Sequence, residues 1–412
     1  MPDNYDPAEM MRRAKAALHV SAPSDSLHQI VSRDPEAFLH IRLLYATDNG
    51  NAIEVPLPKN DPEIAITGIF CGPRFLVYSE AAEQGMRQGT YYYRVKARTL
   101  VDTNFLSDLP NFYEGHPTKS TVAIAKTLKF IETSLGRGFD WSFPLLENLR
   151  EVARGGNPFP YRKVAAAKFF DETGRSTPRL EGFSNDDPQL SAYFREAEKS
   201  WAAVLADPGS WEMVGRRDWV YCVLLKSMTE RWAGSSVKDG LRNIVQFCLD
   251  KLDLLPLKEL YFAWKILQPD SHLAILNETE FKTPTSKSLR RISALAWDLF
   301  LFRWLETQLT DTAGTDFHLP LVTSLDADLM SAIRACPLRA VLIDDRARRV
   351  EAIFDDAREF HEILDGALTP EQRDKAFDPR RKVGRLAFQP TSVGAAIHQL
   401  EKEIEKKAQR AK

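Results

Sequence analysis

The sequence predicts a mixed α/β protein, and three observations lead to this fold class. Two short apolar runs, residues 99–101 and 319–322, each end in polar residues, which is typical of a buried strand that opens into a loop. Residues 157–285 between them carry almost only amphipathic helical patterns. Residues 37–77 before them alternate as strands do. We therefore expect an α/β domain that is interrupted by a helical insertion and preceded by a small β-containing region.

The length of 412 residues is enough for two or three folding units. The patterns divide the chain into five expected segments. These are 1–95 (N-terminal β-containing region), 96–156 (first part of the α/β domain), 157–285 (α-helical insertion), 286–368 (second part of the α/β domain) and 369–412 (charged C-terminal tail or helix).

The individual elements follow from periodicity and from the residues that flank each pattern. Strands are expected at 38–44, 52–55, 64–66, 99–101, 317–322 and 339–343. Helices are expected at 119–135, 143–152, 189–205, 211–232, 241–254, 257–267, 286–309, 346–364 and 393–412. The helix expected at 286–309 is very apolar, and it contains Asp298 near its middle.

Composition and charge exclude several classes of protein. Hydrophobic residues make up 44% and charged residues 27%, as in an ordinary globular protein. The formal net charge of -2 provides no overall basic field for binding nucleic acid or a membrane, so such a partner needs a local patch. Four widely spaced cysteines argue against a zinc site or a disulfide framework. We expect a cytoplasmic protein without a secretory signal or a membrane span.

The feature that points to chemistry is that both apolar runs end in acids. Asp102 follows the first run, and Asp326 with Asp328 follows the second. In open parallel sheets, ligands bind just beyond the carboxyl ends of the strands, so both ends would face one site. Crowded carboxylates repel one another unless a divalent cation compensates, which indicates Mg²⁺ or Mn²⁺ as cofactor. Oxygen ligation of this kind suits phosphodiester hydrolysis.

These two motifs resemble those of a known nuclease family. The stretch 100–106, Leu-Val-Asp-Thr-Asn-Phe-Leu, is similar to the opening strand of PIN-domain nucleases, where apolar residues precede Asp, then Ser or Thr, then Asn. The stretch 321–329, Leu-Val-Thr-Ser-Leu-Asp-Ala-Asp-Leu, resembles their late motif. The resemblance covers segments 96–156 and 286–368. It implies a PIN-like parallel-sheet domain and a metal-dependent nuclease, usually one that acts on RNA.

The resemblance also implies roles for individual residues. Asp298 matches the family's acid on a mid-domain helix, and Glu147 matches an earlier helical acid, with Asp140 and Glu151 as alternatives. The expected metal ligands are Asp102, Asp298, Asp326 and Asp328; Glu147 is a further catalytic candidate, and Thr103, Asn104 and Thr323 would position the substrate. Two departures from the family are the long interval between Glu147 and Asp298 and the spacing of three between Thr323 and Asp326, where two is usual.

Candidate cations for the substrate phosphates are also present. They are Arg94, Lys96, Arg98, Arg290, Arg291, Arg380, Arg381 and Lys382. The expected partner is therefore nucleic acid, RNA rather than DNA, with a regulatory protein or an oligomer also possible. Because nucleases of this family often serve as toxins or antiviral effectors, the resemblance extends to that role.

Structural interpretations compete with these functional ones. Asp102 and Asn104 also suit a turn or helix cap, and Asp326 with Asp328 suits the first turn of a helix, where acids complement the helix dipole. Asp298 is harder to explain in this way, because it is flanked by large apolar residues. The alternative function is therefore a nuclease-like protein that has lost its chemistry and serves as an interaction or regulatory subunit.

Overall fold

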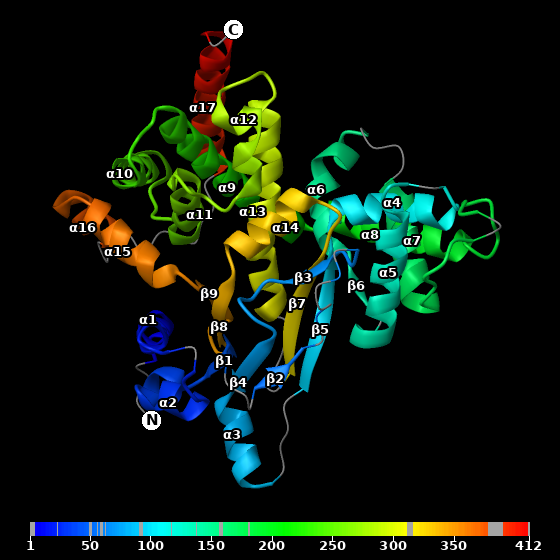
Figure 1. Cartoon of the computed structure of the whole chain (residues 1–412), viewed down its shortest axis with the longest axis horizontal. Coiled ribbons are helices and arrows are strands. Elements are labelled where there is room, and N and C mark those ends of the chain that lie inside the picture. The colour runs from blue at the N-terminus through cyan, green and yellow to red at the C-terminus, as the bar shows by residue number, and fades with distance from the viewer. Residues whose placement is uncertain are drawn as a thin grey trace. The chain divides into compact units, whose positions relative to one another are not determined.

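The computed structural model confirms a mixed α/β fold with two sheets, which include parallel strands (Figure 1). It describes residues 5–22, 24–48, 52–55, 57, 61, 63–89, 94–116, 118–136, 138–155, 160–179, 182–310, 316–377 and 390–410. The chain divides into two compact units. The first is Met1–Ala206 with Arg303–Asp355, and the second is Asp207–Phe302 with Asp356–Lys412.

The first unit contains a four-stranded sheet with the order β3-β7-β5-β6. Its strands are β3 (Ile66–Gly68), β5 (Arg94–Val101), β6 (Phe139–Asp140) and β7 (Asp316–Thr323). β5 runs parallel to both β6 and β7, whereas β3 is antiparallel to β7. The two runs that the sequence predicts as buried strands are therefore neighbours, although more than 200 residues separate Val101 from Thr323 along the chain.

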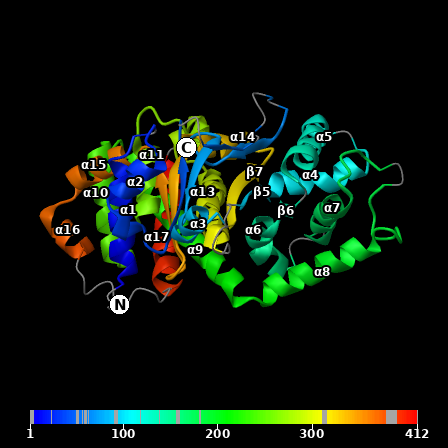
Figure 2. The same cartoon turned by 90° about the horizontal axis from the view of Figure 1, so that it is seen from below.

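Helices cover one face of this sheet. They are α4 (Thr103–Tyr113), α5 (Thr121–Phe130), α6 (Ser142–Ala153), α7 (Pro160–Thr173) and α8 (Ser191–Ala206), with the π-helical turn η2 (Ile131–Leu135) after α5. Val101 and Leu321 of the strands share one buried core with Phe105 of α4 and Phe170 of α7, and Figure 2 shows these helices grouped beside β5 and β6. Because α7 and α8 complete this core, residues 160–206 belong to the first unit rather than to a separate helical block.

A second, five-stranded sheet belongs to the same unit and is antiparallel throughout, with the order β2-β4-β1-β8-β9. Its strands are β1 (Ile41–Ala46), β2 (Ile53–Glu54), β4 (Arg74–Tyr78), β8 (Leu338–Asp344) and β9 (Arg349–Phe354). The helices α1 (Pro7–His19), α2 (Leu27–Ser32), α3 (Glu80–Arg87) and α14 (Ala327–Ala335) and the turn η1 (Pro35–Phe38) also lie in this unit. The strands expected near residues 38–44, 52–55 and 339–343 thus form one sheet.

The prediction of a helix at 346–364 is wrong for the first half of this range. Residues 349–354 form β9, which pairs with β8, and the helix α15 (Ala357–Ala367) begins only afterwards. The Asp344 carboxylate accepts hydrogen bonds from the amides of Arg346 (3.0 Å) and Ala347 (2.8 Å), which closes the turn between the strands. Pairing with the largely buried strand β8 therefore outweighs the local helical propensity of these residues.

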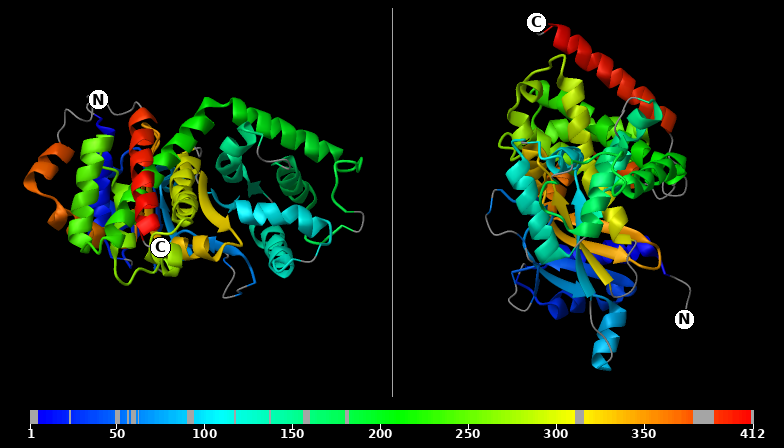
Figure 3. Two further views of the ribbon diagram at one scale, coloured as in Figure 1. Left: turned by 90° about the horizontal axis from the view of Figure 1, so that it is seen from above. Right: turned by 90° about the vertical axis from the view of Figure 1, so that its right-hand side faces the viewer.

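The second unit is helical. It comprises α9 (Pro208–Trp232), α10 (Val237–Phe247), η3 (Cys248–Leu252), α11 (Leu257–Leu267), η4 (Ala274–Asn277), α12 (Thr279–Lys282), the part of α13 (Ser288–Thr310) up to Phe302, α15, α16 (Pro370–Phe377) and α17 (Pro390–Arg410). The expected C-terminal helix is α17, drawn red beside the green helices in Figure 3. It buries Val393, Leu400 and Ile404, and the Tyr221 hydroxyl of α9 donates to its Glu401 at 2.9 Å. None of the described helices is both long and apolar enough to cross a membrane.

Candidate active site

Two of the expected acids lie at the carboxyl ends of neighbouring parallel strands. Asp102 directly follows β5, and Asp326 follows β7 after a short link. The strands remain in register to their last residues, Val101 and Thr323, and the Asp102 amide donates to the Thr323 carbonyl at 2.9 Å. This edge is where open parallel sheets bind their ligands, so the position of both acids agrees with the prediction from the motifs.

Each of these acids caps the helix that follows it. The Asp102 carboxylate accepts from the Asn104 amide at 3.2 Å at the start of α4. The Asp326 carboxylate accepts from the amides of Asp328 (2.8 Å) and Leu329 (3.3 Å) at the start of α14. The structural interpretation as helix caps is therefore correct for both acids, and it accounts for three of their hydrogen bonds.

The two motifs also bind each other through their side chains. The Ser324 hydroxyl donates to Asp102 Oδ2 at 2.8 Å and accepts from the Asp326 amide at 2.9 Å. In the opposite direction, the Asn104 side-chain amide donates to Asp326 Oδ2 at 3.0 Å. Each strand end therefore supplies a hydrogen-bond donor to the acid of the other. This exchange fixes the two carboxylates beside each other.

The electrostatics of the pair are unfavourable for the charged form of Asp102. Its residue surface is only 6% exposed, and burial raises the pKa of its carboxyl above the ordinary value, to which the nearby charge of Asp326 adds. Hydrogen bonds from the Ser324 hydroxyl and from the amides of Asn104 and Thr103 partly oppose this rise. No lysine or arginine in the described part of the chain forms an ion pair with Asp102. Asp102 is therefore a buried acid without a cationic partner among the residues that the structure describes.

Glu147 is connected to the same motif. The Thr103 hydroxyl at the start of α4 donates to Glu147 Oε2 on α6. Of the two alternatives to Glu147, Asp140 instead accepts from the Ser142 hydroxyl and pairs with Arg98, and Glu151 is exposed. Glu147 is thus the helical acid that a hydrogen bond links to the residue next to Asp102.

The last predicted residue of the motif, Thr323, has an unusual environment. Its side chain is completely buried, and its hydroxyl has no hydrogen-bond partner among the described residues. Buried hydroxyls of this kind are uncommon and are normally satisfied by a water molecule, an ion or a ligand. Because the Thr323 carbonyl accepts the Asp102 amide, this unsatisfied hydroxyl belongs to the residue that borders the acid pair.

Asp102 and Asp326 provide carboxylate oxygens, which are the ligands that a divalent cation such as Mg²⁺ prefers. In the part of the chain that the structure describes, no three His, Cys, Asp or Glu side chains lie close enough together to hold a metal ion. Mg²⁺, however, commonly binds through only one or two carboxylates, with water and substrate phosphates as its other ligands. A carboxylate has about four lone-pair sites, so Asp102 and Asp326 both retain a site that their hydrogen bonds do not use. The pair fits a cation that is completed by substrate.

Comparisons with known proteins add nothing to this geometry. No protein-family model, curated protein or solved structure matches the chain. The assignment of a function therefore depends on the two motifs and on the contacts between them.

The other two predicted ligands occupy different positions. Asp298 lies half-buried on α13 in the second unit. Asp328 occupies the first turn of α14, where its amide donates to Asp326. Both remain predictions as metal ligands.

The four predicted phosphate-binding cations whose side chains the structure describes are either engaged or exposed. Arg98 pairs with Asp140 at 2.9 Å, and Arg291 donates to Glu278 at 2.8 Å. Lys96 and Arg290 are exposed. The remaining predicted cations are not described: the side chain of Arg94 and the basic run Arg380, Arg381 and Lys382 lie outside the described residues.

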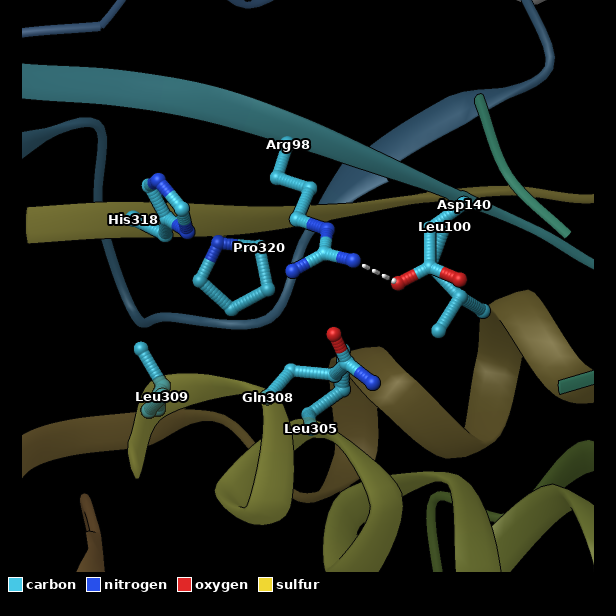
Figure 4. Close-up of a pocket in the computed structure, with 8 residues that line it drawn as sticks. All are labelled: Arg98, Leu100, Asp140, Leu305, Gln308, Leu309, His318 and Pro320. Atoms are coloured by element: carbon cyan, nitrogen blue, oxygen red, sulfur yellow. Dashed lines mark ion pairs between the residues drawn. The ribbon is translucent and has the colours of Figure 1, made fainter. Parts of the chain in front are cut away.

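A small pocket lies on the sheet face opposite α4–α8 (Figure 4). It is lined by Arg98, Leu100, Asp140, Leu305, Gln308, Leu309, His318 and Pro320. Figure 4 shows the Arg98 guanidinium extended across it toward Asp140, whose side chain is 4% exposed. Apart from Asp140, none of the predicted catalytic residues contributes to this lining, so the pocket is not the site formed by Asp102 and Asp326.

Sequence reasoning missed Ser324. The motif at 321–329 suggests no role for this residue, whereas its hydroxyl connects Asp102 with the Asp326 amide. The available signal was its position directly after a parallel strand, which is where ligand-binding residues gather in such sheets.

Proposed function

We propose that the first unit is a PIN-like, metal-dependent nuclease whose site is built on Asp102 and Asp326. The observation that carries this proposal is a buried carboxylate with a raised pKa that faces a second carboxylate and has no cationic partner in the described chain. Such a pair costs free energy when both groups are charged, and perturbed acids of this kind concentrate at functional sites. A divalent cation is the simplest species that compensates the repulsion between the two charged carboxylates.

Each residue of the candidate site would have its own role in the reaction. Asp102 and Asp326 would hold Mg²⁺ or Mn²⁺, while Ser324 and Asn104 keep the two carboxylates oriented through the hydrogen bonds described above. When bound, the cation would supply an activated water for attack on the phosphodiester and would stabilise the leaving oxygen. Glu147, held by Thr103, is a candidate to accept a proton from that water.

Single-stranded RNA is the proposed substrate, in preference to DNA. This preference comes from the resemblance to PIN-domain nucleases, and a role as a toxin or antiviral effector would follow from the same resemblance. With only two carboxylates in the pair, we expect the protein to bind Mn²⁺ weakly by itself and more tightly when RNA supplies phosphate ligands.

The test is a cleavage assay with purified protein, Mn²⁺ or Mg²⁺, and labelled single-stranded RNA and DNA. We expect Asp102→Asn and Asp326→Asn to reduce cleavage at least about 100-fold, because neutral amides are poor ligands for a hard divalent cation. The matched control is Asp207→Asn, which changes another helix-capping acid, in the second unit. Cleavage that survives both site variants would contradict the proposal. Asp298→Asn tests the predicted third ligand, and unchanged cleavage would remove it from the site.

The alternative is a nuclease-like protein without catalysis that acts through protein partners. It is favoured by one observation, namely that helix capping already accounts for the amide contacts of both acids. Folded wild-type protein that cleaves neither RNA nor DNA with either metal would support this alternative.

A further inference from the structure

The third parallel strand of the four-stranded sheet ends in an aromatic residue at the same edge as the two acids. β6 ends at Asp140 and is followed by Trp141, just as β5 is followed by Asp102. Asp140 pairs in parallel with Leu100, and neighbouring strands lie about 4.8 Å apart. Trp141 therefore leaves the sheet one strand away from Asp102 and one residue short of its level.

A second contact fixes Trp141 relative to the candidate site. Trp141 is the N-cap residue of α6, and Glu147 lies less than two turns further along the same helix, at about 3.6 residues per turn. Glu147 accepts the Thr103 hydroxyl, and Thr103 directly follows Asp102 in the chain. The position of Trp141 is therefore set both by strand pairing and by a helix contact that leads to the acid pair.

The Trp141 ring is half-buried. It packs in part against the core of the first unit, in which Phe139 and Phe170 contact each other at 4.7 Å between ring centroids. The rest of the ring reaches the surface, where the Lys168 ammonium group on α7 lies 4.9 Å from the ring centroid. A ring that the core holds in this way is preorganised for stacking, because it loses little conformational freedom when a ligand binds.

Lys168 has no ion-pair partner among the residues that the structure describes. The charges of Asp171 and Glu196 act on it, but neither carboxylate lies within ion-pair distance of its ammonium group. Its contact with the Trp141 ring is a cation–π interaction, which is weak where water still reaches the cation. The ammonium group is therefore available to an anionic ligand that approaches the ring.

We propose that Trp141 stacks a base of single-stranded nucleic acid and that Lys168 binds the adjoining backbone phosphate, next to the phosphodiester at the Asp102–Asp326 pair. This inference rests on the proposed nuclease function and names the contacts that hold the substrate there. When the strand binds, the ammonium group moves from the ring to the phosphate, and the base takes its place on the ring. Base stacking on an aromatic side chain is stronger than an exposed cation–π contact, so the exchange is favourable. Stacking does not read the base, so the contact would tolerate any sequence.

The experiment measures equilibrium binding of a labelled oligouridylate to the full chain, with EDTA present to prevent cleavage, across a range of KCl concentrations. We expect Trp141→Leu to weaken binding about fivefold or more, because leucine keeps the apolar contact with the core but has no ring on which a base can stack. Trp141→Phe should retain most of the affinity. Lys168→Met should reduce the slope of log affinity against log salt by about 0.7, the value for one phosphate contact on a single strand.

A spectroscopic signature separates stacking from a merely structural role of the ring. Oligouridylate should quench part of the tryptophan fluorescence of the wild type, and Trp141→Phe should lose that quenching. The matched controls are Trp211→Phe, which removes an exposed tryptophan of the second unit, and Lys129→Met, which removes an exposed lysine of α5 that pairs with Glu132. Both controls should retain the wild-type affinity and the wild-type amplitude of quenching.

The outcomes separate this inference from the proposed function. If the wild type cleaves RNA but Trp141→Leu and Lys168→Met keep its affinity, quenching and salt slope, the inference is wrong and the nuclease proposal stands. If the wild type binds RNA through these two residues but does not cleave it, the stacking contact stands and catalysis is wrong. If the wild type neither binds nor cleaves RNA, both are wrong. Unchanged far-UV circular dichroism of the variants shows that folding is intact.

Discussion

Replacing Asp102 by asparagine should stabilise the protein while it abolishes cleavage. The asparagine side-chain oxygen can accept the same hydrogen bonds from the Ser324 hydroxyl (2.8 Å) and the Asn104 amide (3.2 Å), so these contacts and the helix cap are retained. What disappears is a buried negative charge that faces Asp326. Because burial raises the pKa of this carboxyl, its charged form destabilises the folded state at pH 7, and we expect the neutral asparagine to raise the free energy of unfolding.

The pH dependence of this gain in the free energy of unfolding shows whether the buried charge of Asp102 causes it. Since the folded pKa of Asp102 lies above its unfolded value of 3.8, the folded state binds the proton more tightly and the wild type loses stability as the pH rises between the two values. Below pH 3.8 both states are protonated and the variant should show little gain. Above the folded pKa the gain should be constant.

Urea unfolding at a series of pH values, followed by tryptophan fluorescence, measures this difference. Asp207→Asn is the control of opposite sign, because hydrogen bonds from Ser210 and Gly209 lower the pKa of Asp207, so that its carboxylate supports stability once the pH is above the unfolded value. A loss of more than about 1 kcal/mol in Asp102→Asn at pH 7 would refute the reasoning, since it would mean that the charged carboxylate stabilises the fold.

Three other predictions concern stability. Ser324→Ala removes a buried hydrogen bond to a carboxylate and should lower the free energy of unfolding by about 1.5–3 kcal/mol, measured by urea denaturation; an effect below 0.5 kcal/mol would contradict the role of this hydroxyl. Burial raises the pKa of Asp171 to about 6, so Asp171→Asn should gain stability relative to wild type as the pH rises from about 4 to 6, and a gain that is independent of pH would argue against this cause. In the second unit, Lys265→Met removes the ion pair with Asp356, whose remaining side-chain partner among the described residues is the Tyr261 hydroxyl. We expect the free energy of unfolding to fall by about 1–3 kcal/mol, measured as a lower thermal midpoint, because Asp356 is only partly exposed. Lys375→Met, whose exposed ion pair with Asp250 is screened by solvent, should change the thermal midpoint little.

The part of the fold that could be predicted was the part encoded by local periodicity. The helix expected at 257–267 coincides with α11, and the helix expected at 211–232 ends with α9, because their apolar spacing and flanking residues are read within a few turns. The strand β9 was missed because its residues have no strong strand pattern, and only pairing with β8 makes them extended. The assignment of α7 to the sheet unit likewise depends on long-range contacts such as that between Phe170 and Phe139.

For the candidate site, too, the sequence predicts the local motifs but not the contacts between distant residues. The residues of both strand-end motifs were recognisable from the sequence, because an apolar run that ends in acids is a local signal. The exchange of hydrogen bonds between Ser324 and Asp102 and between Asn104 and Asp326 was not, since each spans 222 residues of chain.

By itself, the sequence determined that this chain forms an α/β protein and that acids follow two of its buried strands. Those properties are set by the order of apolar and polar residues over short distances. Only the tertiary structure decided that the two strands are parallel neighbours in register, so that one acid is buried against the other. That pairing is a property of the packed sheet, because the desolvation that raises the pKa of Asp102 exists only once the strands and helices have closed around it.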